Sequence, residues 1–174
     1  GSNSAYRKNY EPMVPSTYFL EYPNLFRSPY TNDGIHCPQQ YFDQFDSLFS
    51  QLVDPSMVAA IIMEPIQGEG GYIVPPVEFV QYVRNICDTY GIMLIFDEVQ
   101  TGFGRTGKMF AYEHFGVKPD IMSTAKALGA GFPLSAVIAK KEIMEQWPSG
   151  AHGGTFGGNP VSCAAGLASI GVLE

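Results

Sequence analysis

The sequence predicts an α/β fold with a mostly parallel sheet, because short apolar runs alternate with segments of helical period. Three apolar runs, at residues 58–63, 92–96 and 121–124, have the length of strands. Two other segments, 40–52 and 76–90, place apolar residues three or four positions apart, as on one face of a helix. Strands joined through helices in this way are typical of parallel βαβ units.

The first half of the chain follows this plan after a proline-rich start. Residues 1–38 contain many prolines and aromatic residues, which predicts an extended, loop-rich segment that covers the rest. The helix expected over 76–90 ends at Gly91, a residue suited to the left-handed conformation of a helix end. The run 92–96 is wholly apolar, so we expect it to be covered on both faces.

The second half gives weaker signals. A strand is expected at 134–139 and a short helix at 140–147. Asn159 and Pro160 predict the start of a last helix, because asparagine caps helices well and proline suits the first helical position.

Composition excludes several classes of protein. The 174 residues carry a net charge of −7, which gives no support for nucleic-acid binding. The apolar runs are far shorter than the ~20 residues of a membrane-spanning helix, so no membrane partner is expected. The three cysteines form no closely spaced pair, which favours mostly buried, reduced thiols in a cytoplasmic protein. The histidines show no metal-ligand spacing, so no metal site is expected.

Polar residues follow three of the expected strands: Glu64, Asp97 and Lys126. Because parallel strands present their carboxyl ends at one edge, these side chains are expected to lie where ligands bind. A lysine and a buried acid there are typical of a pyridoxal 5'-phosphate (PLP) site, where lysine forms a Schiff base and the acid keeps the pyridine nitrogen protonated. At ~4 Å and an effective dielectric constant of about 20, the attraction between this acid and the ring is roughly 4 kcal/mol. Pattern alone leaves open that Asp97 is a structural cap and Lys126 a surface lysine.

Three neighbouring residues complete the hypothesis. Gln100 could hydrogen-bond the ring hydroxyl oxygen, and Val99 could pack on a ring face. Thr155 lies among glycines just before the last helix, a place suited to a phosphate group.

The glycine-rich stretch 102–108 matches two nucleotide-binding patterns, GxGxxG and GxxxxGK. Its glycines begin six residues after the expected strand, and Met109 stands where a phosphate loop has serine or threonine. We therefore interpret the stretch as a glycine-rich active-site loop whose backbone must pass close to something.

Four linked motifs give the chain a resemblance to a known family. They are EPIQGEGG (64–71), FDEVQTGFGRTG (96–107), AKALGAGFPL (125–134) and GGTFGGNP (153–160). In this order they resemble the class III PLP-dependent aminotransferases. The N-terminal stretch, from Tyr6-Arg7-Lys8 to Pro23-Asn24, is most similar to the 4-aminobutyrate aminotransferases of that family.

The resemblance implies the fold-type I architecture of PLP-dependent transferases and a homodimer with active sites at the subunit interface. It implies that Lys126 is the Schiff-base lysine, Asp97 the pyridinium partner and Gln100 the ring-hydroxyl contact. Thr155 would bind the phosphate of the neighbouring subunit's cofactor. Glu69 matches a glutamate that gates the site between substrates, and Glu64 matches an acidic residue beside it.

The resemblance also implies that residues 1–174 are part of the large PLP-binding domain, without the upstream phosphate cup and the C-terminal small domain. The implied reaction moves an amino group from an ω-amino acid such as 4-aminobutyrate to 2-oxoglutarate. An acetylornithine or ornithine aminotransferase and an amino-acid racemase or epimerase of the same family remain open. A third alternative is an inactive fragment that serves only as a structural or association module, and the isolated chain is expected to be inactive.

Overall fold

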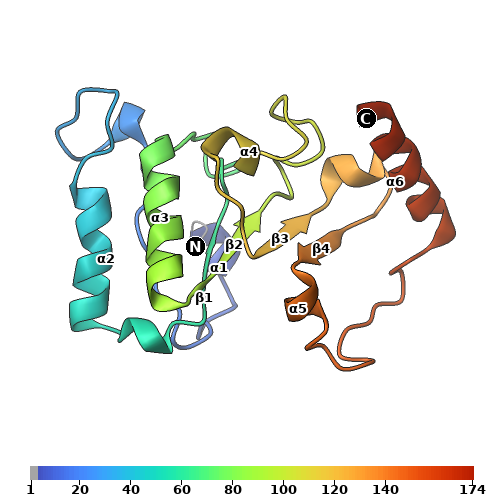
Figure 1. Cartoon of the computed structure of the whole chain (residues 1–174), viewed down its shortest axis with the longest axis horizontal. Helices are drawn as coiled ribbons and strands as arrows, with labels where there is room; N and C mark the ends of the chain where they lie inside the picture. The colour runs from blue at the N-terminus through green and yellow to red at the C-terminus, as the bar shows by residue number, and fades with distance from the viewer. Residues whose placement is uncertain (1–3) are drawn as a thin grey trace.

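The computed structural model describes residues 4–174 of the chain. Its centre is a four-stranded sheet with the strand order β1-β2-β3-β4 (Figure 1). The strands are β1 (Ala60–Met63), β2 (Met93–Asp97), β3 (Ile121–Thr124) and β4 (Ala136–Ala139). Strands β1, β2 and β3 are parallel, and β4 runs antiparallel to β3. The expected mostly parallel sheet is therefore confirmed.

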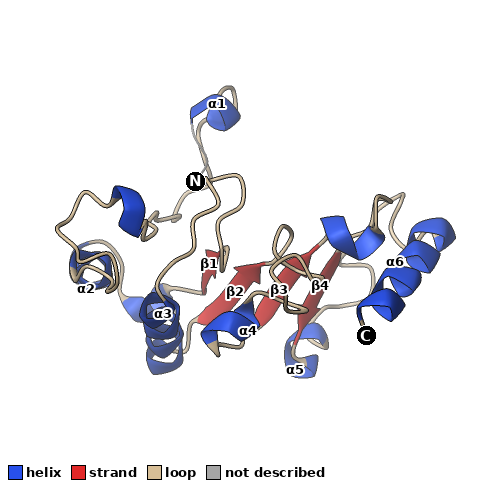
Figure 2. Cartoon of the chain, turned by 90° about the horizontal axis from the view of Figure 1, so that it is seen from above, coloured by secondary structure: helices blue, strands red, loops and turns tan. Residues whose placement is uncertain are grey.

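Helices lie on one side of this sheet and beyond its two edges (Figure 2). They are α1 (Ser4–Arg7), α2 (Gln40–Gln51), α3 (Val77–Tyr90), α4 (Tyr112–Phe115), α5 (Lys141–Met144) and α6 (Pro160–Leu173). Figure 2 shows α3, α4 and α5 on the same side of the strands, with α2 outside α3 and α6 beyond β4. Within residues 4–174, none of these helices has the length and apolar character needed to cross a membrane.

Local sequence sets the ends of the two long helices beside the sheet. Gly91, with φ 71°, ends α3 in the left-handed conformation that glycine adopts at little cost. The side chain of Asn159 accepts a hydrogen bond from the Ser162 N–H at 2.9 Å and so caps the start of α6. Both helix ends lie where the sequence predicts them.

The core lies between the sheet and the helices α2 and α3. Leu94 and Phe96 of β2 are fully buried and belong to one cluster with Phe45, Val80 and Val83. The alternate side chains of β2 point to the other face, where Met93 is 40% exposed. The expectation that residues 92–96 are covered on both faces is therefore wrong for the described chain, because the helices cover one face only (Figure 2).

Asp120 lies directly before β3, at the end of the sheet where this strand begins, and its hydrogen bonds join several elements. It is 8% exposed, and its carboxylate accepts hydrogen bonds from the Leu94 N–H at 2.9 Å, from Arg84 at 2.9 Å and from Lys140 at 3.0 Å. Burial by itself raises the pKa of Asp120, but the three donors outweigh burial and lower this pKa below its usual value. One carboxylate thus joins β2, β3, α3 and the residue that precedes α5.

The cysteines are free thiols. Cys37 and Cys87 are buried and Cys163 is half-buried. Burial raises the pKa of both the Cys37 and the Cys87 thiol to about 11, so both are protonated at neutral pH.

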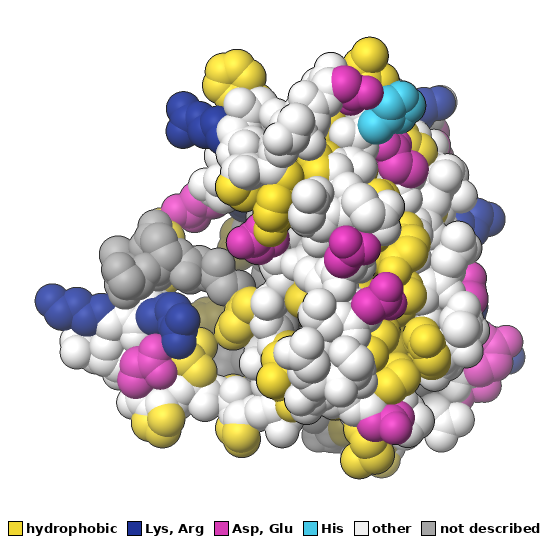
Figure 3. All heavy atoms as spheres, turned by 90° about the vertical axis from the view of Figure 1, so that its left-hand side faces the viewer, with side chains coloured by type: hydrophobic (Ala, Val, Ile, Leu, Met, Phe, Trp, Pro, Cys, Tyr) yellow, Lys and Arg dark blue, Asp and Glu magenta, His cyan; other side chains and the backbone are white. Residues whose placement is uncertain are grey.

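A shallow groove runs along α2, away from the strand ends. Figure 3 shows this side of the molecule, where apolar side chains lie among scattered carboxylates. Tyr18, Phe19 and Leu20 of the N-terminal segment form one wall of the groove, and Leu48 and Leu52 belong to the other. None of the residues that sequence analysis proposes for chemistry lines this groove.

Candidate active site

The loop after β3 presents Lys126 toward the loop after β2. Lys126 begins a short 3-10 turn, Lys126–Gly129, and has the left-handed φ of 42°, which is unusual for a residue with a side chain. Its Nζ donates a hydrogen bond to Oε1 of Gln100 at 2.5 Å. The structure therefore brings together two residues that lie 26 positions apart and that the sequence places after different strands.

Asp97 ends β2 with one carboxylate oxygen occupied and one open. Oδ1 accepts hydrogen bonds from the Val99 N–H at 3.0 Å and from the Ser123 hydroxyl at 3.3 Å. Among residues 4–174, Oδ2 has no hydrogen-bond partner. Successive side chains of a strand point to opposite faces, so the Asp97 side chain lies on the open face with Ile95, opposite the buried Phe96. On that face Asp97 is paired with Ser123 of β3. An acceptor on this face is free to bind a donor from a ligand.

Glu98 is a buried residue that sequence analysis did not identify. It is 0% exposed, and its carboxylate accepts hydrogen bonds from the Thr101 hydroxyl at 2.6 Å and from the N–H groups of Ala111 at 2.9 Å and Tyr112 at 2.8 Å. These bonds close the loop between β2 and α4, which contains Gln100. A second carboxylate directly after Asp97, at the end of an apolar strand, was the signal available in the sequence.

The loop after β1 lies against the loop after β2. Oε2 of Glu64 accepts the N–H of Gly68 at 2.7 Å, and Gly68 is buried against the side chain of Gln100. The Tyr22 hydroxyl donates to the main-chain carbonyls of Glu64 at 3.0 Å and Pro65 at 3.1 Å. Burial raises the pKa of this hydroxyl above its usual value, so Tyr22 stays a donor.

Glu69 stands at the exposed tip of the same loop. Two hydrogen bonds between the main chains of Gln67 and Ile73 close the loop behind it. Its carboxylate accepts a hydrogen bond from the Tyr6 hydroxyl, and this bond raises the pKa of Tyr6 above its usual value. Glu69 is thus positioned on the strand-end side of the molecule, joined to the N-terminal segment.

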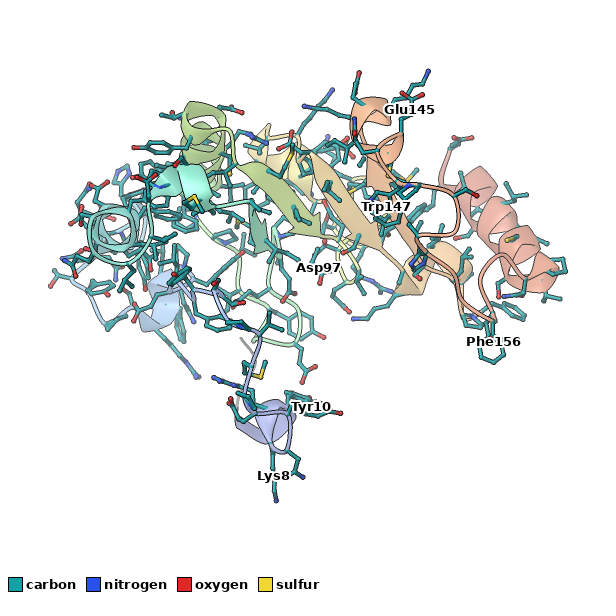
Figure 4. The ribbon with its side chains drawn as sticks, turned by 90° about the horizontal axis from the view of Figure 1, so that it is seen from below. Lys8, Tyr10, Asp97, Glu145, Trp147 and Phe156 are labelled. Atoms are coloured by element: carbon teal, nitrogen blue, oxygen red, sulfur yellow. The ribbon has the colours of Figure 1, made fainter. Side chains whose placement is uncertain are left out.

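Thr155 is not brought to this cluster within the chain. It lies in the exposed loop between α5 and α6. Its neighbour Phe156 is 81% exposed and lies well away from Asp97, below α6 (Figure 4). The structure therefore brings Lys126 to Gln100 and joins Glu64 to Gln100 through Gly68. Asp97 lies at the end of β2, directly before the loop that bears Gln100, and Thr155 lies apart.

The glycine-rich stretch 102–108 has neither neighbour that a nucleotide loop requires. Strand β2 ends at Asp97, well before the first of these glycines, and the helix that follows the stretch, α4, has only four residues. Gly102 passes close to its own chain: its N–H donates to the Glu98 carbonyl at 2.9 Å, and a Cβ there would lie 2.9 Å from the same oxygen. The interpretation of the stretch as a loop with a close backbone approach is confirmed.

Comparison with known proteins identifies the family. A family model described as Aminotransferase class-III matches residues 1–174. The chain belongs to the class III aminotransferases. This match confirms the resemblance inferred from the four motifs.

Relatives within the family have different activities. The chain is 40% identical over 169 residues to a probable 4-aminobutyrate aminotransferase of Bacillus subtilis, covering 97% of the chain and 39% of the relative. It is 52% identical over 133 residues to an acetylornithine aminotransferase of Methanocaldococcus jannaschii, covering 76% of the chain and 33% of the relative. A leucine/methionine racemase of Thermococcus litoralis is 45% identical over 161 residues, covering 92% of the chain and 36% of the relative. The chain thus spans a third to two fifths of the length of these relatives.

Solved structures give the same family. An amine transaminase from an uncultivated Pseudomonas species, in a PLP-bound form, superposes with a TM-score of 0.86 at 36% identity and covers 99% of this chain and 40% of that one. An (S)-enantioselective omega-transaminase from Thermomicrobium roseum gives a TM-score of 0.85 at 33% identity, covering 98% and 39%. These matches confirm the expected fold class of PLP-dependent transferases, and they indicate PLP as the cofactor.

The residues at the strand ends of this aminotransferase chain fit PLP. The Lys126 amine is exposed and able to bond with an aldehyde. Oδ2 of Asp97 is an open acceptor for a protonated ring nitrogen. The amide nitrogen of Gln100 has no hydrogen-bond partner among residues 4–174, so it is an open donor for a ring hydroxyl oxygen. The donor and acceptor types therefore match three groups of the cofactor.

Proposed function

We propose that this chain carries the PLP-binding part of an aminotransferase that moves an amino group from an ω-amino acid, such as 4-aminobutyrate, to 2-oxoglutarate. The observation that carries the proposal is the cluster at the strand ends, where Lys126 donates to Gln100 and Asp97 keeps one oxygen open. PLP supplies an aldehyde that accepts the amino group and a ring that withdraws electrons from the substrate carbon.

Lys126 has two tasks in this proposal. Its amine would hold the cofactor covalently at Nζ. When it is not bonded to the cofactor, the same amine would take up and return the proton of the substrate carbon, as a general base and acid. The hydrogen bond to Gln100 keeps Nζ near the site when it is not bonded to the cofactor.

Asp97, Gln100 and Val99 set the charge and position of the ring. Oδ2 of Asp97 would hold the proton on the ring nitrogen, because a carboxylate stabilises a nearby cation in a poorly solvated site. The Gln100 amide would donate to the ring hydroxyl oxygen. Val99 would pack on one ring face, and its N–H already fixes Oδ1 of Asp97.

The remaining assignments concern the neighbouring subunit and the substrate. We propose a homodimer in which Thr155 binds the phosphate of the other subunit's cofactor, an assignment supported by its exposed loop far from Asp97 (Figure 4). Glu69 would act as the substrate gate. Residues 1–174 would form part of the large domain, in a cytoplasmic enzyme.

Two other reactions of the family have specific support. The acetylornithine aminotransferase relative favours a different amino donor, and the racemase relative favours return of the proton to either face of the substrate carbon. Incubation with one enantiomer of an amino acid and no oxo acid distinguishes a racemase from an aminotransferase. Inversion would indicate a racemase, whereas a requirement for an oxo acid would indicate an aminotransferase.

The test of the site is an absorbance spectrum of the full-length gene product after addition of PLP. We expect a Schiff-base band that is lost in Lys126→Ala and kept in Lys108→Ala, an exposed lysine of the glycine-rich loop. Addition of 4-aminobutyrate should bleach the band and 2-oxoglutarate should restore it. A band of equal strength in Lys126→Ala would refute Lys126 as the Schiff-base lysine. Absence of bleaching would refute 4-aminobutyrate as the amino donor.

A further inference from the structure

The main chain of Gly68 makes three hydrogen bonds in the loop after β1. Its N–H donates to Oε2 of Glu64 at 2.7 Å, a bond strengthened by the charge of the carboxylate. Its carbonyl accepts the N–H groups of Gly71 at 3.1 Å and Tyr72 at 3.0 Å. Glu69 directly follows Gly68, so the position of Gly68 sets the direction in which the Glu69 side chain leaves the loop.

Gly68 also touches the cluster at the strand ends. A Cβ at this position would lie 2.8 Å from Cγ and 3.1 Å from Cβ of Gln100, so only glycine allows the loop to come this close. The other end of the Gln100 side chain accepts the hydrogen bond from Lys126. Contacts thus run without a gap from Glu64 through Gly68 and Gln100 to Lys126.

The base of this arrangement is fixed. The Tyr22 hydroxyl donates to the carbonyls of both Glu64 and Pro65, so the main chain that bears Glu64 is attached to the N-terminal segment. Glu64 is half-buried, and among residues 4–174 the Gly68 N–H is the hydrogen-bond partner of its carboxylate. Oε2 of Glu64 is therefore bound to the loop, and this contact fixes the position of Gly68.

We propose that Glu64 is a positioning residue that, through Gly68, sets both the placement of Gln100 beside Lys126 and the direction of the Glu69 loop. The inference rests on the proposed function, because it takes Gln100 as a contact of the cofactor. It changes the role of Glu64 from a second gate for substrate to a support for the gate and for the cofactor contact.

The test compares Glu64→Ala with Glu64→Gln in the PLP-loaded full-length gene product. Glutamine keeps an acceptor for the Gly68 N–H, whereas alanine removes it. We expect alanine to raise the pH midpoint of the cofactor absorbance change by about half a unit or more. The ring oxygen would lose the Gln100 amide as its donor, and it would therefore attract the proton on Nζ of Lys126 more strongly. Glutamine should cause less than half of that shift.

A second readout needs no cofactor. Hydrogen exchange of residues 64–73 in the PLP-free protein should be about tenfold faster in Glu64→Ala, because the Gly68 amide loses its partner. Glu78→Ala is the matched control. Glu78 lies in the first turn of α3, and its carboxylate likewise accepts a main-chain N–H, that of Cys37, at 2.8 Å. It should speed exchange near residue 37 and leave the absorbance midpoint unchanged.

The outcomes separate this inference from the proposed function. Faster exchange with an unchanged midpoint in Glu64→Ala would overturn the inference, because Glu64 would then support the loop without reaching Gln100. An equal shift of the midpoint in Glu64→Gln would also overturn it, since charge and not the hydrogen bond would be responsible. No PLP band in the unmodified protein would refute the proposed function itself, whatever the exchange data show.

Discussion

Replacing Glu98 by glutamine tests whether a buried carboxylate holds the loop that carries Gln100. The carboxylate of Glu98 serves three donors: the Thr101 hydroxyl and Ala111 N–H on Oε2, and the Tyr112 N–H on Oε1. Glutamine has nearly the same shape but replaces one acceptor oxygen with a donor. In either orientation of the amide, the buried N–H of Ala111 or the half-buried N–H of Tyr112 then faces an NH₂ group.

The cost follows from the hydrogen bonds. With the amide oxygen in place of Oε2, two donors keep their acceptor, and the Tyr112 N–H loses its own. An unsatisfied buried N–H costs about 1–3 kcal/mol, and the remaining bonds weaken because the acceptor is no longer charged. Neutralisation also relieves part of the cost of burying a charge. The net loss in the free energy of unfolding should be about 2 kcal/mol, a large share of the roughly 5–15 kcal/mol of a typical domain.

Urea denaturation of the PLP-free protein measures this loss. With a slope of about 1–3 kcal/mol per molar urea, the midpoint should fall by roughly 1 M. Glu113→Gln is the matched control, because Glu113 accepts the Phe110 N–H at 2.9 Å in the same loop but at an exposed position. A Glu98→Gln midpoint equal to that of the control would refute the reasoning.

Three further substitutions test other parts of the structure by the same assay. Asp120→Asn should cost about 2 kcal/mol at neutral pH, because the amide serves fewer of the three donors and carries no charge. The pKa of Asp120 lies below its usual value despite burial, so its stabilisation is present above the unfolded pKa of ~3.9 and is lost as pH falls through the folded pKa. Asp120→Asn should therefore flatten the decline of stability on the acid side, and an unchanged decline would contradict this. Gly102→Ala should cost about 1–3 kcal/mol, because the added carbon meets a main-chain carbonyl that cannot move aside. Tyr22→Phe should cost about 1 kcal/mol by removing the donor to two carbonyls.

The fold could be predicted from the sequence where the signal is local. Helix α3 begins one residue after the expected 76–90 and ends at its predicted boundary, because apolar period and Gly91 are both properties of the segment itself. The strand at 121–124 also matches its expected bounds. The antiparallel direction of β4 could not be predicted, because the pairing partner of a strand is decided by the whole chain and not by its own residues.

The candidate site divides in the same way. The approach of Lys126 to the loop after β2 follows from the common edge of parallel strands, so sequence reasoning could anticipate it. The burial of Glu98 and the contact of Gly68 with Gln100 depend on how two irregular loops fold, and no periodicity in the sequence reports that. The role of Thr155 depends on a second subunit and stays a prediction.

The three loops at the strand ends share a feature that explains why they brace one another. Each contains a non-glycine residue in the left-handed region: Tyr72 at φ 54°, Phe103 at φ 52° and Lys126 at φ 42°. Such conformations cost of order 1–3 kcal/mol each and persist only where surrounding contacts hold them. The contacts available are between and within the loops, including Gly68 against Gln100 and Gln100 with Lys126. Substitutions in different loops should therefore be non-additive, since each loop supports the strained backbone of its neighbour.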